Sequence, residues 1–296
     1  MYDIIIVGGG PAGLTAAIYA LRGGASVLLL EKTLIGGQAA RLNEITNFPS
    51  YSSINGYELT DRMFNQASAL GLTVMYEEVN GLTRDEGLFT VTTPKGSYSA
   101  KSVIIATGAT HTTLGIEQDY IGKGAHYCAT CDGFFYTGKT VALVGSGRVA
   151  LTEALYLSNI VGKLYFVFKG DENKSKVFLS PLLAKNNVEI IYNYLPTKIE
   201  GQTVERLNLE NASGEHLSID IDGLFVSVGT TALTGFVANT IDNKNGSIIA
   251  NGSMKTNLDG VFACGDCLNK ELKQIVTACS EGATAGESAL EYLQNH

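Results

Sequence analysis

The sequence lacks any long hydrophobic run, and this absence bears first on membrane insertion. Its apolar segments are short, whereas a helix that spans a bilayer needs about 20 consecutive apolar residues. The amino terminus, MYDIIIVGGG, carries no basic leader, and its apolar stretch ends in glycines, as in a buried strand rather than a signal peptide. We therefore expect a soluble, cytoplasmic protein with no membrane partner.

Charged residues and cysteines are also scarce. Only 17% of the residues are charged, the net charge is -8, and no run of Lys or Arg occurs. This composition argues against a nucleic-acid partner, because phosphates bind clustered positive charge. Five cysteines in 296 residues are too few, and odd in number, for a structural disulfide framework. Redox or metal chemistry is the better interpretation of these thiols.

What the sequence does contain is enough for a folded core. The chain is 45% hydrophobic and has no low-complexity tract, which excludes a disordered or fibrous protein. Its 296 residues are too many for one ordinary doubly wound lobe and predict two compact domains.

An internal repeat dominates the organisation of the sequence. Residues 4–31 align with residues 141–168 without a gap, and each copy has the pattern of a strand, a glycine turn, a helix and a second strand. The fingerprint positions are Gly8, Gly10 and Gly13 in the first copy and Gly145, Gly147 and Ala150 in the second. They permit a tight turn, admit a pyrophosphate and keep helix and strand close. Glycines for tight turns alone are the alternative, but two copies in one chain predict an α/β fold with two Rossmann-like dinucleotide-binding domains.

The two copies differ where a ribose would be recognised. Glu31 ends the second strand of the first copy, where an acidic side chain accepts hydrogen bonds from ribose hydroxyls. The aligned residue of the second copy is Phe168, and Arg148 projects from the glycine turn. A cation in this turn either clasps a phosphate or fills the space that a pyrophosphate needs, and the sequence leaves both options open.

Further short strands that end in glycine define the domain organisation. They occupy residues 102–109, 223–229 and 260–266. We expect the second fingerprint domain to be inserted into the first, so that residues 1–113 and 235–296 form one domain and residues 114–234 the other. Residues 274–293 predict a helix that returns to the first domain, because small residues recur along it at helical spacing. These residues are Ala278, Gly282, Ala285 and Ala289.

Two thiols lie three residues apart just before the second fingerprint. They are Cys128 and Cys131 in the segment CATCDG, followed at once by Asp132. A CxxC pair at a helix N-terminus favours the thiolate and can open and close as a disulfide. The adjacent carboxyl is suitably placed to carry the proton that a leaving thiolate needs. A second pair, Cys264 and Cys267, raises the alternative of a four-thiolate zinc site, but the long gap between the pairs exceeds ordinary zinc-module spacing, and we expect no metal.

These motifs together give the chain a family resemblance over its whole length. The segments that carry it are GGGPAG at 8–13, GGQ at 36–38, NFP at 47–49, ATGA at 106–109, CATCDG at 128–133, GVFACGD at 260–266 and ELKQIVTA at 271–278. With them the chain resembles the low-molecular-weight thioredoxin reductases, which are FAD enzymes. The resemblance implies that the first domain and the tail hold FAD through Gly8, Gly10, Pro11, Ala12, Gly13, Glu31, Gly37, Gln38, Asn47, Gly265, Asp266, Gln274 and Ile275.

The resemblance also implies how the cysteines act. Reduced flavin opens the Cys128–Cys131 disulfide, with Cys131 as the partner of the flavin, and Cys128 then attacks the disulfide of thioredoxin. In this family the middle domain rotates between these two tasks, and the boundaries near 113 and 235 would supply the hinges. A homodimer is expected from the resemblance alone.

The sequence departs from the family pattern where NADPH binds. Members that use NADPH carry a His-Arg-Arg run after the second strand of the middle domain, whereas this chain has Phe168, Lys169 and Gly170, and then Asp171 and Glu172. Lysine lacks the bidentate fork of arginine, and the two acids repel a phosphate. In this respect the chain resembles the ferredoxin-dependent flavin thioredoxin reductases, which implies ferredoxin as the electron donor.

Two alternatives for the electron path remain open. A conventional NADPH enzyme would use Lys169 and Lys174 in place of arginines, and a flavin-dependent dithiol oxidase would pass electrons from dithiols to oxygen. An acidic ferredoxin would need a basic surface. Residues 161–187 contain five lysines and two acids, although such a patch is usually only a solvated face.

Overall fold

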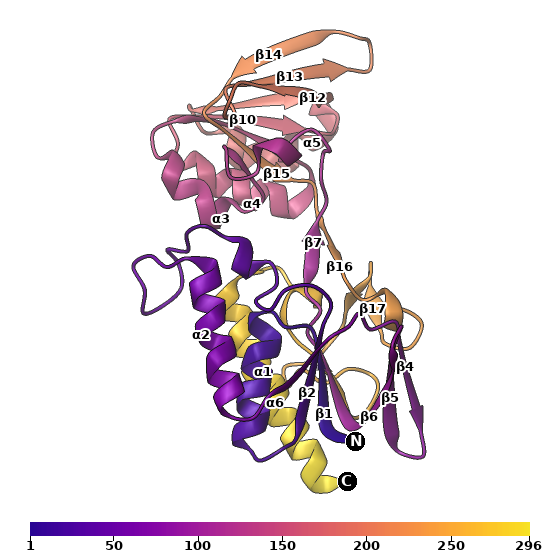
Figure 1. The fold of residues 1–296 in the computed structure, drawn as a ribbon. Helices are drawn as coiled ribbons and strands as arrows, with labels where there is room; N and C mark the ends of the chain where they lie inside the picture. Colours follow the sequence, from indigo (N-terminus) through magenta and orange to yellow (C-terminus); the bar gives the residue numbers. More distant parts are fainter. The chain divides into compact units, whose positions relative to one another are not determined.

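The computed structural model describes residues 1–296 and consists of two compact α/β units (Figure 1). Unit 1 comprises Met1–Thr110 and Thr231–His296, and unit 2 comprises His111–Thr230. The second Rossmann-like unit is inserted into the first, as the repeat predicts. The chain leaves unit 1 in β7 (Ala109–His111) and returns in β16 (Thr230–Ala232), and these two strands form a two-stranded sheet. Both junctions lie a few residues before the positions 113 and 235 expected from the sequence.

Unit 1 is built on five parallel strands. They are β1 (Tyr2–Val7), β2 (Val27–Glu31), β3 (Thr73–Tyr76), β6 (Gly96–Ile105) and β19 (Val261–Ala263). The spatial order is β3-β2-β1-β6-β19. The first half of β6 also pairs antiparallel with β5 (Leu88–Thr93), and β5 with β4 (Gly81–Asp85). The central strands are runs of Ile, Leu and Val because both faces of a parallel sheet are covered.

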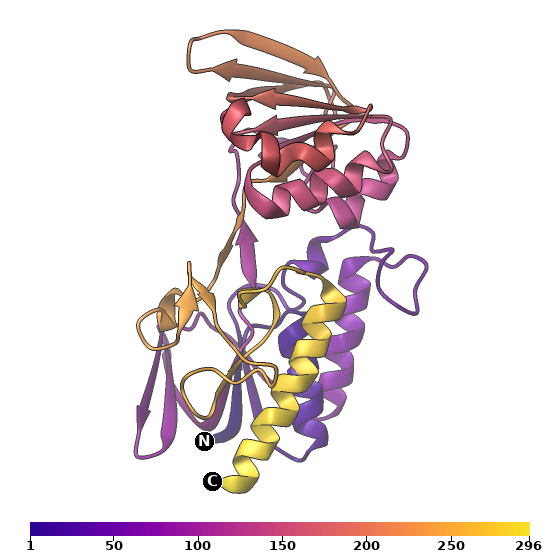
Figure 2. The ribbon, with the colours of Figure 1, turned by 180° about the vertical axis from the view of Figure 1, so that it is seen from behind.

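Three helices cover one face of this sheet (Figures 1 and 2). They are α1 (Pro11–Arg22), α2 (Gly56–Ala69) and α6 (Ile275–Asn295). The predicted tail helix is confirmed as α6, and its small residues Ala278, Gly282, Ala285 and Ala289 are buried. A Cβ atom at Gly282 would overlap the carbonyl oxygen of Ala12. Glycine at this position therefore allows α6 to approach α1 closely.

The other face of the unit 1 sheet packs on shorter elements. Apolar side chains of β1 and β2 that point away from the helices form a second core with Val237, Ile241 and Ile248. The short elements of unit 1 are η1 (Ala39–Arg41), η4 (Gly235–Val237), β17 (Asn243–Lys244), β18 (Ser247–Ile248) and η5 (Gly265–Cys267).

Unit 2 repeats the plan on a second parallel sheet, in the order β11-β10-β9-β15-β8. The strands are β8 (Ala125–His126), β9 (Thr140–Gly145), β10 (Lys163–Phe168), β11 (Val188–Tyr192) and β15 (Gly223–Ser227). One face carries α3 (Ala129–Asp132), α4 (Gly147–Ser158) and α5 (Glu172–Leu183). The other face carries the antiparallel strands β12 (Tyr194–Glu200), β13 (Arg206–Asn211) and β14 (His216–Asp220). Two short helices complete the unit, η2 (Gln118–Tyr120) and η3 (Gly133–Tyr136).

The aligned halves of the repeat form the same local structure. β1-α1-β2 and β9-α4-β10 are both parallel βαβ units, and α1 and α4 each have 12 residues. None of the helices combines the length and the apolar character that a membrane crossing requires.

Candidate active site

The glycine turn between β1 and α1 is shaped so tightly that side chains are excluded at two of its positions. Gly8 has a φ of 109°, and a Cβ atom there would overlap the carbonyl oxygen of Ala106. A Cβ atom at Gly13 would overlap the carbonyl oxygen of Gly8. Because Gly13 has no side chain, the first turn of α1 packs directly against the end of β1, as expected for the third fingerprint position.

The middle of the same turn is open. A Cβ atom at Gly10 would meet no other atom within 4 Å, and Gly10 is the N-cap of α1, with Pro11 at the first helical position. The N–H of Gly36 donates to the carbonyl of Gly9 at 2.8 Å, and Gly37 lies against Gly10. The turn and the 36–38 loop therefore leave a space beside a helix N-terminus, which fits a pyrophosphate such as that of FAD.

Glu31, at the end of β2, faces this turn. Its side chain is 8% exposed, and its two oxygens accept hydrogen bonds from the N–H groups of Gly9 and Thr33, each at 2.8 Å. The hydrogen bond to Gly9 holds the turn in shape. Because a carboxylate offers about four acceptor positions, Glu31 can still accept a ribose hydroxyl.

Gly265 and Asp266, which follow β19, also lie beside the N-terminus of α1. A Cβ atom at Gly265 would lie 2.8 Å from the Cβ of Ala12. One carboxylate oxygen of Asp266 is buried and forms an ion pair with Lys270 Nζ at 3.3 Å, but it accepts no hydrogen bond. Its unused acceptor position fits a ribityl hydroxyl of FAD.

A buried ion pair fixes this strand end, and the sequence interpretation missed it. Glu281 of α6 accepts from the N–H of Gly265 at 2.8 Å and from Lys270 Nζ at 2.7 Å. Both side chains are less than one-fifth exposed. No sequence pattern marks the pair, because its members come from a loop and from the middle of a helix.

The remaining predicted FAD residues form a second group within unit 1. Asn47 Nδ2 donates to Gln274 Oε1 at 3.0 Å, across 227 positions of sequence, and Gln38 donates to the carbonyl of Ala109. Gln274 is the N-cap of α6, and Ile275 packs on the small apolar cluster of Ile45, Ile54 and Leu59.

In unit 2, Cys128 and Cys131 form a disulfide with a Cα–Cα distance of 5.3 Å. Both residues are half-buried. The carbonyl of Cys128 accepts from the N–H groups of Cys131 at 3.3 Å and of Asp132 at 3.1 Å. The predicted helix that begins at the pair is a single turn, α3, with Cys128 as its N-cap. The dipole of so short a helix is small. Stabilisation of a thiolate at this pair therefore depends more on the neighbouring side chains than on the helix.

Asp132 is held by a histidine that the sequence interpretation did not single out. Asp132 Oδ2 lies 3.2 Å from His126 Nδ1, and the other ring nitrogen of His126 lies 2.8 Å from the hydroxyl of Tyr136. The side chains of His126 and Asp132 are 17% and 22% exposed. The one sequence signal for His126 is its position two residues before Cys128.

Glu153, on α4, is a second carboxyl near the disulfide loop. Its Oε1 accepts from the N–H of Ala129, between the two cysteines, at 3.5 Å. Burial raises the pKa of this carboxyl, and hydrogen bonds from Ser227 and Ala129 oppose the rise. Glu153 therefore stays protonated to a higher pH than an ordinary glutamate.

The geometry is that of a redox disulfide in one unit and a nucleotide cradle in the other, and comparison with known proteins agrees. The family model of pyridine nucleotide-disulphide oxidoreductases matches residues 2–282. The chain belongs to this family.

Relatives of this oxidoreductase match it over nearly the whole chain. The thioredoxin reductase of Treponema pallidum is 36% identical over 298 residues, which cover 99% of this chain and 97% of that protein. The crystal structure of thioredoxin reductase from Streptococcus pyogenes has a TM-score of 0.93 at 35% identity and covers 100% of this chain and 99% of that chain. A ferredoxin-flavin thioredoxin reductase from Clostridium acetobutylicum has a TM-score of 0.56 at 30% identity, with coverage of 99% and 98%.

The second cysteine pair of this oxidoreductase lies in the core of unit 1. Cys264 and Cys267 are free thiols with no exposed surface, and Cys267 Sγ donates to the carbonyls of Ile105 and Cys264. Burial raises the pKa of both thiols, that of Cys267 to about 11. Neither thiol forms a thiolate readily, and both act as small apolar residues.

The nucleotide turn of unit 2 is closed where a ribose would be recognised. Phe168 is 6% exposed and packs on the rings of Phe166, Phe178 and Tyr192. Asp171 follows it but is committed to the helix, because its side chain accepts from the N–H of Lys174 as the N-cap of α5. The position aligned with Glu31 therefore offers no acid to a ribose.

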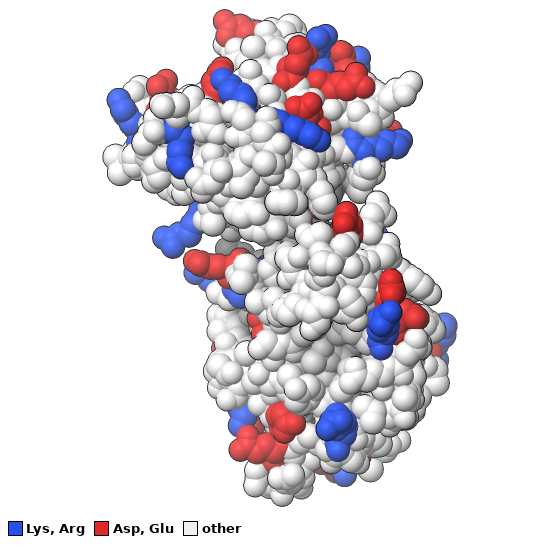
Figure 3. All heavy atoms as spheres, turned by 90° about the vertical axis from the view of Figure 1, so that its left-hand side faces the viewer, with Lys and Arg blue, Asp and Glu red and all other residues white.

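The basic character of residues 161–187 is weaker in the structure than in the sequence. Lys163 is paired with Glu189 at 2.7 Å, whereas Lys169, Lys174 and Lys176 are exposed at the start of α5. On the face drawn in Figure 3, positive and negative side chains alternate over unit 2 without forming a continuous patch of one sign.

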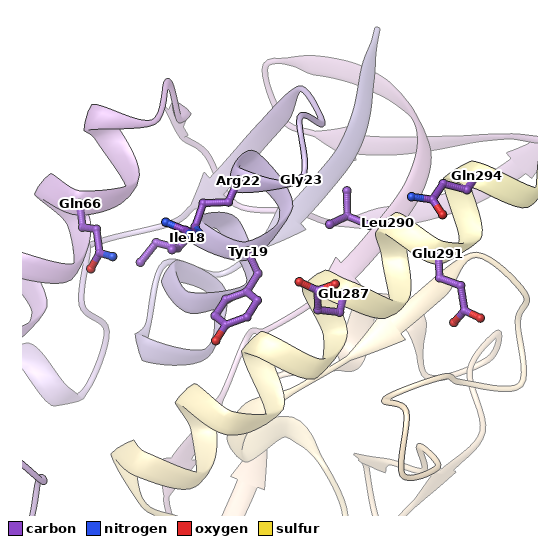
Figure 4. A pocket seen from close by; sticks show the side chains of 9 residues that line it. All are labelled: Ile18, Tyr19, Arg22, Gly23, Gln66, Glu287, Leu290, Glu291 and Gln294. Atoms are coloured by element: carbon purple, nitrogen blue, oxygen red, sulfur yellow. The ribbon is translucent and has the colours of Figure 1, made fainter.

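One surface pocket of unit 1 lies outside the candidate site. It measures about 710 Å³ and lies between α1, α2 and α6 (Figure 4). Its lining includes Arg22, Gln66 and Glu287, all on helix surfaces, and contains none of the residues assigned to FAD.

Proposed function

We propose that this oxidoreductase is a thioredoxin-disulfide reductase that binds FAD in unit 1 and passes electrons through Cys128 and Cys131 to thioredoxin. The observation that carries the proposal is the half-buried Cys128–Cys131 disulfide, with the Asp132 carboxyl in the same turn. The full-length similarity to proteins named thioredoxin reductase supports it. The glycine turn, Glu31 and Asp266 would hold the cofactor. When bound, FAD supplies the electron pair that a disulfide needs for reduction.

The chain's own residues account for the exchange of disulfides. In the reduced state Cys128 loses its proton to Asp132 and attacks the thioredoxin disulfide, which forms a mixed disulfide and releases one thioredoxin thiolate. Cys131 then loses its proton, attacks Cys128 Sγ, releases the second thioredoxin thiolate and restores the Cys128–Cys131 disulfide. The two thioredoxin thiolates take up this proton and the one held by Asp132. Two electrons and two protons pass to thioredoxin in total, so the step balances.

We assign the electron donor as reduced ferredoxin rather than a pyridine nucleotide. The buried Phe168 and the helix-capping Asp171 support this assignment, because they remove the usual contacts to a ribose or its phosphate. Two ferredoxin molecules would each supply one electron. The resemblance extends the proposal to a homodimer in solution.

The donor is tested by anaerobic mixing in a stopped-flow instrument. Reduced ferredoxin should bleach the flavin absorbance rapidly, whereas NADPH and NADH in excess should leave it oxidised on the same timescale. Rapid bleaching by NADPH would return the protein to the conventional enzymes that use Lys169 and Lys174. Oxygen consumption with a small dithiol, in the absence of thioredoxin turnover, would instead identify a dithiol oxidase.

Asp132→Asn tests the proton carrier. The asparagine fills the same space but cannot take a proton from Cys128, and the loss of a positioned acid–base group costs about 10²–10⁴-fold in rate. We expect thioredoxin reduction by the pre-reduced protein to slow by that factor, with normal flavin content. An unchanged rate would remove Asp132 from the mechanism.

A further inference from the structure

A chain of three polar side chains ends at Asp132, the residue that follows Cys131. His126 is the last residue of β8, and its ring lies between the Asp132 carboxylate, at 3.2 Å from Nδ1, and the Tyr136 hydroxyl, at 2.8 Å from Nε2. Asp132 belongs to the turn that carries Cys131. All four residues lie within unit 2, so the arrangement is a property of that unit alone.

The surroundings of His126 hold the ring in one orientation. Its ring stacks on Phe225 of β15, with centroids 5.2 Å apart and an interplanar angle of 26°. Tyr136 is 8% exposed and packs edge-on against both rings. An imidazole fixed in this way can exchange a proton without losing its contact to Asp132.

The direction of the hydrogen bonds follows from the Asp132 carboxylate. An ionised carboxylate only accepts, so Nδ1 of a neutral His126 carries the proton and donates to Asp132. Nε2 is then the acceptor, and the Tyr136 hydroxyl donates to it. Burial raises the pKa of the Tyr136 phenol, and the carboxylates of Asp132 and Asp222 raise it further, so this hydroxyl keeps its proton.

The other charged groups near this chain are few. The ammonium of Lys139 lies 5.2 Å from the Tyr136 ring centroid, and Glu153 of α4 reaches the N–H of Ala129. Asp132 is the carboxylate in contact with the imidazole. The positive charge that His126 gains on protonation therefore acts most strongly on the Asp132 carboxylate.

We propose that His126 is a positioning residue for thiol–disulfide exchange. Its imidazole orients the Asp132 carboxylate to accept the Cys128 proton, and the charge of the imidazole sets the basicity of that carboxylate. With neutral His126, Asp132 accepts the Cys128 proton as the thiolate attacks. With protonated His126, the adjacent cation stabilises the carboxylate and weakens it as a base. The inference rests on the proposed function, because it concerns the same thiol–disulfide exchange.

The proposal predicts an acid limb in the rate of thioredoxin reduction, because protonation of the imidazole weakens Asp132 as a base. Between pH 7.5 and 5.5 the wild-type rate should fall about tenfold, as the loss of a positioned general base would produce. His126→Gln keeps an N–H donor for Asp132 but does not titrate, so its rate should change less than about twofold over the same range. His126→Ala removes the donor as well and should be slow at every pH.

Tyr136→Phe checks the second link of the chain. The phenyl ring keeps the packing on Phe225 but removes the hydroxyl that donates to Nε2 of His126. A hydrogen bond donated to the neutral imidazole favours that form. Its loss should favour the protonated imidazole, and the acid limb should move to higher pH.

The experiment uses the flavin-loaded protein, reduced anaerobically with stoichiometric dithionite and mixed with oxidised thioredoxin from pH 5 to 9, so that it is independent of the natural donor. His216→Gln is the matched control, because His216 is an exposed histidine on β14 of the same unit, and its profile should equal the wild type. An acid limb that persists unchanged in His126→Gln would overturn the proposal.

A second measurement keeps this outcome separate from a failure of the proposed function. If the wild type does not reduce thioredoxin at any pH, the proposed function is wrong, and the rate of Cys128 alkylation by iodoacetamide in the reduced protein is followed instead. That rate follows the Cys128 thiolate and falls with pH in both proteins, but the wild type should show an additional limb that His126→Gln lacks. Equal alkylation profiles in the two proteins would contradict the role of His126.

Discussion

Cys128→Ser is expected to abolish thioredoxin reduction while the protein stays yellow and folded. The serine hydroxyl is a far weaker nucleophile than a thiolate at neutral pH, and the Cys128–Cys131 disulfide cannot form without the second sulfur. The substitution lies in unit 2, whereas the residues assigned to FAD lie in unit 1. The measurement is the rate of thioredoxin reduction by the pre-reduced protein, with flavin content taken from the absorbance ratio.

Cys131→Ser is the matched control for this result. It keeps the attacking thiol of Cys128 but removes the one that resolves the mixed disulfide, so a covalent complex with thioredoxin should accumulate and disappear on addition of a reductant. Full activity of Cys128→Ser would show that Cys128 is not the attacking thiol. A covalent complex formed by Cys128→Ser, and not by Cys131→Ser, would show that the roles of the two thiols are exchanged.

Gly13→Ala is expected to cost this protein its flavin and the stability of unit 1. The added methyl group would overlap the carbonyl oxygen of Gly8. Gly13 lies in the first turn of α1 and Gly8 directly follows β1, so neither backbone can move aside easily. Overpacking of this kind costs about 1–3 kcal/mol or more. Thermal unfolding followed by circular dichroism should show a clear loss of stability in the flavin-free protein, and purified protein should be colourless.

Gly10→Ala separates flavin binding from folding. No protein atom lies within 4 Å of the added Cβ, and the φ of -75° suits any residue. Unfolding of the flavin-free protein should therefore be unchanged within about 0.5 kcal/mol. Flavin affinity should fall by about tenfold or more, because the methyl group enters the space assigned to the pyrophosphate. Normal affinity in this variant would place the cofactor elsewhere.

Much of the fold was predictable because its signals are local. The apolar run of β1, the glycines that follow it and the periodicity of α1 lie within about 20 residues, and the same pattern recurs in β9 and α4. The small residues of α6 likewise mark a helix that packs closely, whatever its partner.

The sequence does not show which contacts a charged residue makes. The Asp171 carboxylate keeps the negative charge that is expected to repel a phosphate, and in the structure it also caps α5. Lys163 was counted in a basic surface, but it is paired with Glu189 on the neighbouring strand. The helix expected at Cys128 is a single turn. In each case a contact made by tertiary packing or capping decides the role, and composition does not contain it.

Local residue patterns predict the two dinucleotide-type units, the insertion of one into the other and the CxxC pair beside Asp132, since each is encoded by residue types at short, fixed spacing. Which distant side chains meet is visible only in the folded chain. Folding brings Glu281 to Gly265, Asn47 to Gln274 and His126 to Asp132 and Tyr136. The physical reason is that a hydrogen bond between separate elements depends on strand order, register and helix packing, which no local pattern specifies.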